Sequence, residues 1–133
     1  DDEKWRKILR GLNEEFYHKT VTTKEIEDYI SEKMNYNLAP FFDQYLRDFR
    51  IPTLEYSIND GYLNLRWINV IDDFKMPVEI EIDNNKLFIE CETSYKRIPI
   101  KSDKIKIDKD YYVFSKKIWK SFMKFLYLKI LNL

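Results

Sequence analysis

The chain has 133 residues, and its 23 lysines plus arginines balance 23 aspartates plus glutamates, so the formal net charge is zero. This balance argues against a dedicated nucleic-acid binder, which usually carries a basic excess. One cysteine excludes an internal disulfide, and one histidine with one cysteine excludes a His- or Cys-rich zinc site in this chain. The hydrophobic share of 44% predicts a folded protein with a core of its own.

The first part of the chain has the three- and four-residue apolar spacing of helices. Apolar residues recur in this way between Trp5 and Phe16 and predict a first helix. A second helix is predicted after Thr22, because Thr22 and Glu25 have the spacing of a capping box. The apolar stripe of this second helix consists of Ile26, Tyr29, Ile30 and Met34.

A third helix is predicted from Leu38 to about Ile51, with Asn37 as its cap. Pro52 ends it, because the residue before a proline disfavours helical backbone angles. Its apolar face consists of Phe41, Phe42, Tyr45, Leu46 and Phe49. Residues 1–51 are therefore predicted to form a short helical bundle.

After Pro52 the hydrophobic period changes to two, which is typical of strands. Turns are predicted at residues 59–61 and 83–86, where Asn, Asp and Gly gather. The alternating apolar residues are Leu54, Tyr56, Ile58, Leu63, Leu65, Trp67, Met76, Val78, Ile80, Ile82, Leu87, Ile89, Cys91, Ile98, Ile100, Ile105 and Ile107. About six short strands over some sixty residues predict an antiparallel β-sandwich over residues 52–114.

The end of the chain is basic and apolar. Residues 111–133 contain five lysines and no acidic residue. We expect a cationic amphipathic helix over residues 115–131, in a C-terminal segment of residues 115–133. Such a helix can lie on an anionic membrane or dock on protein, and docking is favoured because apolar helix faces usually have protein partners. The predicted fold class is thus α+β, with helices, then a sandwich, then this basic helix.

Two polar features are candidates for chemistry, and each also has a structural interpretation. His18 can act as a general base or a lone metal ligand, but a position at a helix end, favoured by the helix dipole, explains it as well. A set of carboxylates can bind a hard cation or form an acid–base pair: Asp72, Asp73, Glu79, Glu81, Glu90 and Glu92. The alternation of these glutamates on strands favours a solvated sheet face instead.

Aromatic residues on the predicted strands are a further candidate, as a platform for a sugar or a peptide. They are Tyr56, Tyr62, Trp67, Phe88 and Tyr95. Packing is the favoured interpretation, because aromatics on strands usually contribute to the core.

Five stretches of sequence carry a family resemblance through their order and spacing. They are residues 16–29 (FYHKTVTTKEIEDY), 38–47 (LAPFFDQYLR), 51–56 (IPTLEY), 65–67 (LRW) and 74–78 (FKMPV). Together they resemble the C-terminal part of aminopeptidase N-like zinc metallopeptidases, the gluzincin aminopeptidases. The resemblance covers roughly residues 4–114.

The resemblance implies that the helices end a thermolysin-like catalytic domain and that the sandwich braces this domain or walls its substrate cleft. Zinc is expected in the parent protein, together with a peptide substrate and, by resemblance alone, a periplasmic or secreted location. The His-Glu-x-x-His motif, its downstream Glu and the Gly-x-Met-Glu-Asn strand are not in this sequence. No residue here therefore inherits a catalytic, cofactor or metal role. Arg66, beside Trp67, is interpreted as a bridge across an interdomain seam.

The chain opens inside a predicted helical turn without an initial Met, which indicates a fragment whose partner is the missing catalytic domain of the same polypeptide. The apolar face of the third helix is then expected to be core or an exposed former interface that promotes self-association. The alternative functions are a stand-alone sandwich for ligand binding or adhesion, and a membrane-peripheral module.

Overall fold

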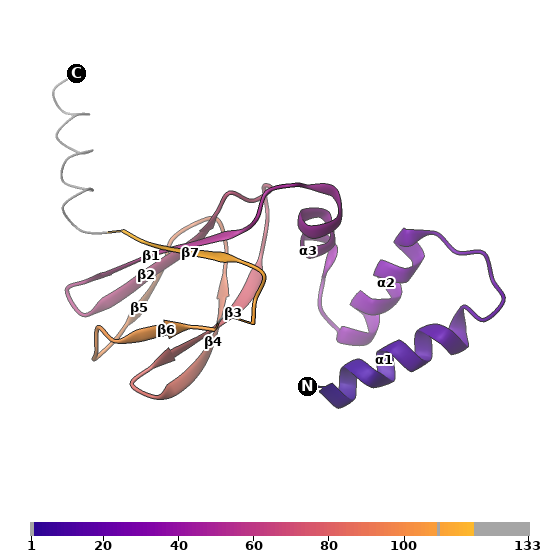
Figure 1. The fold of residues 1–133 in the computed structure, drawn as a ribbon, viewed down its shortest axis with the longest axis horizontal. Helices are drawn as coiled ribbons and strands as arrows, with labels where there is room; N and C mark the ends of the chain where they lie inside the picture. The colour runs from indigo at the N-terminus through magenta and orange to yellow at the C-terminus, as the bar shows by residue number, and fades with distance from the viewer. Residues whose placement is uncertain (1, 109, 119–133) are drawn as a thin grey trace, which may run out of the picture. The chain divides into compact units, whose positions relative to one another are not determined.

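The computed structural model describes residues 2–108 and 110–118. It is an α+β protein in which three helices and a helical turn precede seven strands (Figure 1). The chain divides into two compact units, Asp1–Arg47 and Asp48–Leu133. We call the first the helical unit and the second the sheet unit, and describe each by itself.

In the helical unit, α1 (Asp2–Glu15) and α2 (Thr23–Met34) form an antiparallel pair. At one end Lys4 Nζ donates a hydrogen bond to the carbonyl of Met34, 3.1 Å away. At the other end the ring of Tyr29 meets the ring of Phe16 edge-on, with centroids 5.6 Å apart. Gly11 permits this close approach, because a Cβ at that position would lie 2.2 Å from the Tyr29 hydroxyl.

Both ends of α2 are capped, and the N-terminal end has the predicted capping box. The Glu25 N–H donates to Thr22 Oγ1 at 3.3 Å, and the Thr22 N–H donates to Glu25 Oε2 at 2.7 Å. At the other end Asn35 takes a left-handed conformation with φ of 54°, and its N–H and that of Tyr36 donate to carbonyls of the last turn. Each end of α2 thus satisfies backbone groups that the helix leaves open.

The third helix is shorter than predicted. The α-helix α3 (Ala39–Phe42) continues as a π-helical turn, η1 (Asp43–Arg47), and ends there rather than near Ile51. It ends because the Asp48 carboxylate accepts the N–H of Arg50 at 2.8 Å, a local bond that competes with helical hydrogen bonding. Phe49 therefore lies outside the helix and is 94% exposed.

Seven strands form two sheets in the sheet unit. One sheet has the order β5-β2-β1-β7 and the other the order β4-β3-β6. The strands are β1 (Thr53–Asn59), β2 (Tyr62–Ile68), β3 (Met76–Ile82), β4 (Asn85–Cys91), β5 (Lys96–Pro99), β6 (Ile105–Ile107) and β7 (Phe114–Lys117). The β1–β2 and β3–β4 hairpins turn at the predicted places, through residues 60–61 and 83–84, all with positive φ.

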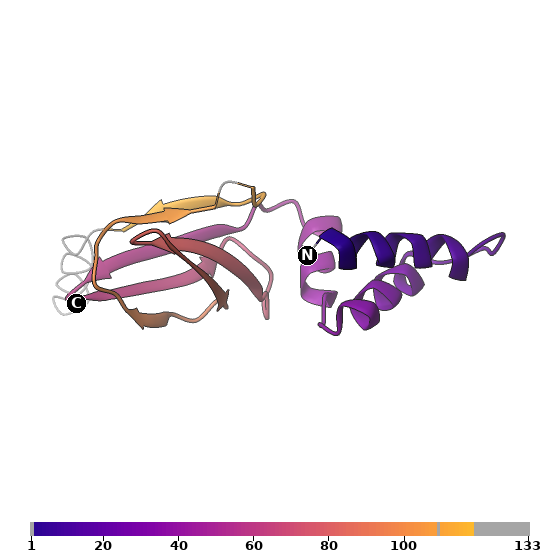
Figure 2. The same cartoon turned by 90° about the horizontal axis from the view of Figure 1, so that it is seen from below.

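The two sheets share one core, and a second view shows them together (Figure 2). Alternate residues of β2 and β3 are buried, as the period of two predicts. In β1 and β4 the prediction is met only in part, because β1 buries Glu55 and Ser57 besides Leu54, and β4 buries Ile89 and Cys91 but leaves Leu87 exposed. Trp67 of β2 joins the sheets, because its Nε1–H donates to the carbonyl of Met76 at 3.0 Å and its ring meets Phe74 edge-on. The buried hydrophobic side chains of this unit are Leu54, Leu63, Leu65, Trp67, Val70, Phe74, Met76, Val78, Ile80, Ile82, Ile89 and Cys91.

The strand β7 differs from two predictions. It lies parallel to β1, so the sheets are mainly but not wholly antiparallel. It also occupies residues 114–117, whereas the sequence predicted a helix from residue 115. The Phe114 N–H donates to the Pro52 carbonyl and the Ile118 N–H to the Tyr56 carbonyl, so pairing with β1 overrides the helical pattern. The remainder of the predicted helix, residues 119–131, lies outside the described residues.

Candidate functional site

A cleft of about 780 Å³ opens on the sheet unit. Its lining comes from β1, β3, β4, β6, β7 and the connection between β6 and β7: Tyr56, Glu79, Glu81, Lys86, Lys106, Ile107, Asp108, Asp110, Tyr111, Val113 and Ser115. The Asp108 N–H donates to the Glu79 carbonyl at 3.2 Å and fixes the start of this connection beside β3. The cleft thus depends on non-local pairing between strands.

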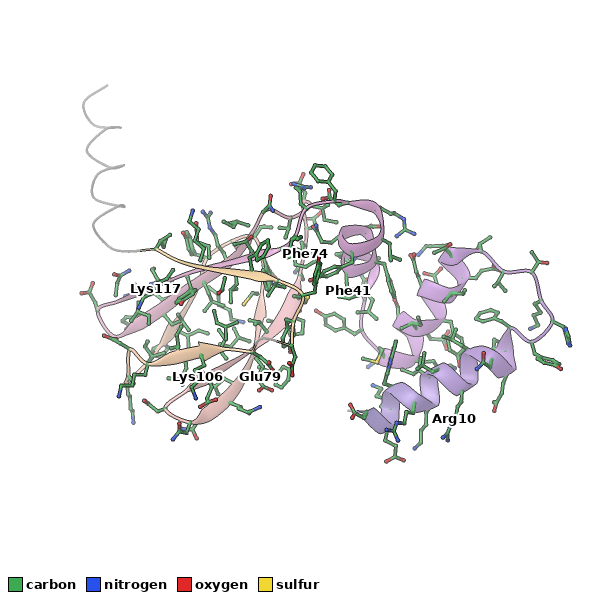
Figure 3. The ribbon with its side chains drawn as sticks, viewed as in Figure 1. Arg10, Phe41, Phe74, Glu79, Lys106 and Lys117 are labelled. Atoms are coloured by element: carbon green, nitrogen blue, oxygen red, sulfur yellow. The ribbon has the colours of Figure 1, made fainter. Side chains whose placement is uncertain are left out.

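Two carboxylates of the cleft form ion pairs across strands. Glu79 Oε1 lies 2.5 Å from Lys86 Nζ, and Glu81 Oε1 lies 3.0 Å from Lys106 Nζ. Glu79 and Lys106 are labelled in the view of the chain with its side chains as sticks (Figure 3). The hydrogen bond from Lys86 to Glu79 raises the pKa of the lysine, so it stays charged. Glu79 and Glu81 therefore lie on one face, as predicted, but as partners of lysines.

The side chain of Tyr111 adds a neutral polar group, its phenol, to the same cleft. Burial raises the pKa of Tyr111, and the nearby charges of Asp108 and Glu79 raise it further. The phenol therefore keeps its proton at neutral pH and can both donate and accept hydrogen bonds. With carboxylates, ammonium groups and phenols, the cleft can bind polar ligands by charge and hydrogen bonds.

A second polar cluster, centred on Glu55, lies on the outer face of the sheet β5-β2-β1-β7. Glu55 is 7% exposed, and its Oε1 accepts hydrogen bonds from Arg66 Nε at 2.9 Å and from the Tyr95 hydroxyl at 2.8 Å. Burial acts to raise the pKa of Glu55, but the bonds from Tyr95 and Arg66 outweigh it and hold the pKa below its ordinary value. The guanidinium of Arg66 also stacks over the Tyr95 ring, 4.4 Å from its centroid.

This cluster was not predicted from the sequence, although the sequence carries a signal for it. The Asn59–Gly61 turn sets the hairpin register, and that register places Glu55 opposite Arg66. Arg66 thus binds its cross-strand neighbour in this unit.

The five predicted platform aromatics do not form one surface. Trp67 is 1% exposed and belongs to the core. Tyr62 and Tyr95 each lie under an arginine, Tyr56 lines the cleft, and Phe88 is 69% exposed on β4. Packing is therefore the correct interpretation for Trp67, and the others are dispersed.

The remaining predicted acidic residues do not converge either. Glu92 lies 2.7 Å from Lys75 Nζ as an ion pair. Asp72 and Asp73 lie in the segment between β2 and β3, where Asp73 has φ of 62°. Within residues 2–108 and 110–118, no group of three or more His, Cys, Asp or Glu side chains is placed to hold a metal ion.

The single histidine and the single cysteine lie in different units. His18 is exposed after the end of α1, with φ of 53° and its ring 4.1 Å from that of Tyr17. Cys91 is fully buried, and burial raises the pKa of its thiol to about 12. A thiolate nucleophile is therefore excluded at Cys91 near neutral pH.

No family model and no curated protein matches this chain. Among the described helices, none is both long enough and apolar enough to cross a membrane.

Proposed function

We propose that this chain is a non-catalytic C-terminal part of a zinc aminopeptidase-like protein. In this proposal the helical unit completes a helical catalytic domain supplied by the same polypeptide. The sheet unit braces that domain or forms a wall of its substrate cleft. One observation carries the proposal: the sheet unit buries a core of its own, and the helical unit does not.

The distribution of buried apolar side chains supports this difference. Of fourteen buried hydrophobic residues in the described part of the chain, Ile8 and Ile30 are in the helical unit and twelve are in the sheet unit. Large apolar residues stay exposed in both units, in the helical unit Trp5, Leu9, Tyr17, Tyr36 and Leu46, and in the larger sheet unit Phe49, Leu87, Phe88, Tyr95, Tyr112 and Phe114. The units therefore differ in what they bury, and helices that bury so few apolar side chains are typical of a domain whose remaining elements are elsewhere.

The structure of the motif residues gives further support. In the run FFDQYL, the side chain of Gln44 is 0% exposed within η1, and the ring of Phe41 lies 4.7 Å from that of Tyr45. In the run IPTLEY, Pro52 is buried and its carbonyl accepts the first hydrogen bond from β7. Both runs therefore occupy fixed places in their units.

In the proposed parent protein, zinc and the carboxylate that activates water come from the catalytic domain. This chain contributes shape, charge and packing. The acidic and phenolic lining of the cleft on the sheet unit is suited to contact a peptide, and the exposed apolar face of α1 is suited to contact helices of the catalytic domain.

The test begins with the reading frame upstream of Asp1. A His-Glu-x-x-His motif with a Glu about eighteen residues later supports the proposal. A Met directly before Asp1 with no such motif contradicts it. The second step expresses that upstream segment and assays leucine p-nitroanilide hydrolysis with and without this chain. We expect activity only when both are present.

The cleft favours a second candidate, a stand-alone ligand-binding module. Titration of the chain with lysine-rich and with neutral peptides, followed by NMR shifts of Tyr111 and Glu79, distinguishes the two. Saturable binding to the isolated chain, without an upstream peptidase motif, favours the module.

A further inference from the structure

The strand β4 forms an edge of the sheet β4-β3-β6, and the described strands pair with it on one side only. Other edges are blunted in ways that prevent pairing with a further strand. Pro99 lies at the end of β5, β6 has three residues, and β7 ends with two lysines. In contrast, β4 has seven residues, contains no proline, and exposes Phe88 by 69%.

The register shows which backbone groups of β4 point outward. In an antiparallel pair of strands, hydrogen-bonded and non-hydrogen-bonded pairs of facing residues alternate. In a non-hydrogen-bonded pair, the N–H and carbonyl groups of both residues point away from the partner strand. Glu79 faces Phe88, and the Glu79 carbonyl accepts from Asp108 on the far side of β3. Glu79 and Phe88 therefore form a non-hydrogen-bonded pair. The N–H and the carbonyl of Phe88 point away from β3, to the open edge of β4.

The same rule applies two residues to either side, at Lys86 and Glu90. The Glu90 carbonyl confirms the direction, because it accepts a hydrogen bond from Lys96 Nζ at 3.0 Å rather than from β3. Lys96 is an exposed side chain on β5 and covers this carbonyl, and the next outward carbonyl, that of Glu92 after β4, accepts the Trp67 N–H at 2.7 Å. The outward groups that a further strand can reach are therefore those of Lys86 and Phe88 and, when Lys96 moves aside, that of Glu90.

We propose that β4 pairs with β4 of a second copy of this chain, antiparallel and about a twofold axis at Phe88. This arrangement is self-complementary. It places Lys86 of one copy opposite Glu90 of the other, Phe88 opposite Phe88, and Leu87 opposite Ile89. The outward backbone groups of the two strands then face each other, and two three-stranded sheets join into one.

Charge selects this register over its neighbours. A shift of two residues in one direction places Lys86 opposite Phe88, and both cross-strand ion pairs are lost. A shift in the other direction places Lys86 opposite Glu92, which lies after the end of β4 and whose carbonyl already accepts the Trp67 N–H at 2.7 Å. The interface is one strand wide, far below the roughly 1,600 Å² of a standard stable complex, so the dimer is weak and depends on concentration.

Charge reversal tests the pairing. We expect Glu90→Lys to weaken dimerisation about tenfold in sedimentation equilibrium, because it sets two lysine pairs face to face. Lys86→Glu also removes the ion pair to Glu79 of its own chain and should weaken the dimer similarly. The double variant Lys86→Glu with Glu90→Lys loses that same pair to Glu79 but should restore the wild-type dimer dissociation constant within about threefold. Lys106→Glu is the matched control, since it removes the ion pair to Glu81 at the other edge strand of this sheet. Far-UV circular dichroism checks that each variant is folded.

Cross-linking gives an independent measure. Facing residues in a hydrogen-bonded antiparallel pair have Cα atoms about 5.5 Å apart, within the range for a disulfide. Under mild oxidation, Phe88→Cys should form a covalent dimer at least about tenfold faster than Phe114→Cys, a control at an exposed position of β7. Buried Cys91 does not compete for cross-linking.

A wild-type chain that stays monomeric at millimolar concentration overturns the proposal. A dimer that the charge reversals leave unchanged, or equal cross-linking at positions 88 and 114, also overturns it. These outcomes do not depend on the upstream reading frame, so the dimer and the proposed function can fail separately.

Discussion

The helical unit and the sheet unit differ in how many apolar side chains they bury and in how they bury them. In the sheet unit, alternation along each strand directs one set of side chains inward, and two sheets close over Trp67, Phe74 and their neighbours. In the helical unit, α1 and α2 pair with each other, but among described residues only Ile8 and Ile30 are buried hydrophobics. A helix pair can satisfy its caps and its backbone without completing a core.

The buried glutamates of the two units, in contrast, are paired in similar ways. In the helical unit Glu27 of α2 is 5% exposed and accepts a 2.6 Å hydrogen bond from Arg47 Nη2, which ties α2 to η1. In the sheet unit Glu55 accepts from Arg66 and Tyr95 on the outer face, away from the apolar core. Each unit thus pairs a nearly buried glutamate with a partly exposed arginine, so the two units differ in apolar packing and not in this ion pair.

The largest expected effect is in the sheet core. Leu65→Ala removes a fully buried side chain and should lower the free energy of unfolding of this unit by about 2–5 kcal/mol. Leu46 in the helical unit is 60% exposed, so Leu46→Ala should change the free energy of unfolding of the helical unit by no more than about 0.5 kcal/mol. Urea denaturation followed by tryptophan fluorescence measures both. Equal losses would contradict the difference between the units.

A substitution at Gly11 should weaken the packing of α1 against α2. An added Cβ meets the Tyr29 hydroxyl, so Gly11→Ala should destabilise the helical unit by about 1–2 kcal/mol, after the gain in helix propensity. In a Tyr29→Phe background the hydroxyl is absent, and the same substitution should be neutral or stabilising by up to about 1 kcal/mol. Helical ellipticity during thermal unfolding measures the cycle. The same loss in both backgrounds would show that the hydroxyl is not the obstacle.

The capping box should account for a smaller share of helical stability. Thr22→Ala leaves the Glu25 N–H without its acceptor, so we expect a loss of about 1 kcal/mol from the helical unit. Thr23→Ala, one position inside α2, is the control and should have little effect. Thermal unfolding followed at 222 nm checks the pair, and an unchanged Thr22→Ala variant would rule out the cap.

The sheet unit should also respond to acid through Glu55. Burial opposes the ionised form, but the bonds from Tyr95 and Arg66 hold the folded-state pKa below the unfolded value of about 4.5. The ion therefore stabilises the unit fully above pH 4.5, and this contribution disappears as the pH falls through the lower folded pKa. Tyr95→Phe should shift that loss of stability to higher pH, as measured by urea midpoints between pH 7 and 2.5. A pH profile identical to that of the wild type would exclude Glu55 as its source.

Local signals in the sequence were sufficient for much of the fold. The capping box at Thr22 and Glu25 and the turns at residues 60–61 and 83–84 each depend on two or three neighbouring residues, and all formed as predicted. The strand alternation also located the buried residues of β3.

Non-local contacts explain what the sequence pattern could not predict. Residues 114–117 have a helix-like pattern, but β1 offers them a parallel partner some sixty residues away in the chain. Ser57 is 7% exposed on the outer face of β1, where alternation predicts solvent. The cleft is of the same kind, because its lining combines six elements through pairings that no single segment encodes.

Native-state hydrogen exchange of the whole chain tests most directly the central claim that the sheet unit closes its own core and the helical unit does not. We predict that amides of β1, β2 and β3 exchange about two orders of magnitude more slowly than those of α1 and α2. The upstream segment, when supplied, should raise protection in α1 and α2 and leave the strands unchanged. Equal protection of both units in the chain alone would contradict the claim.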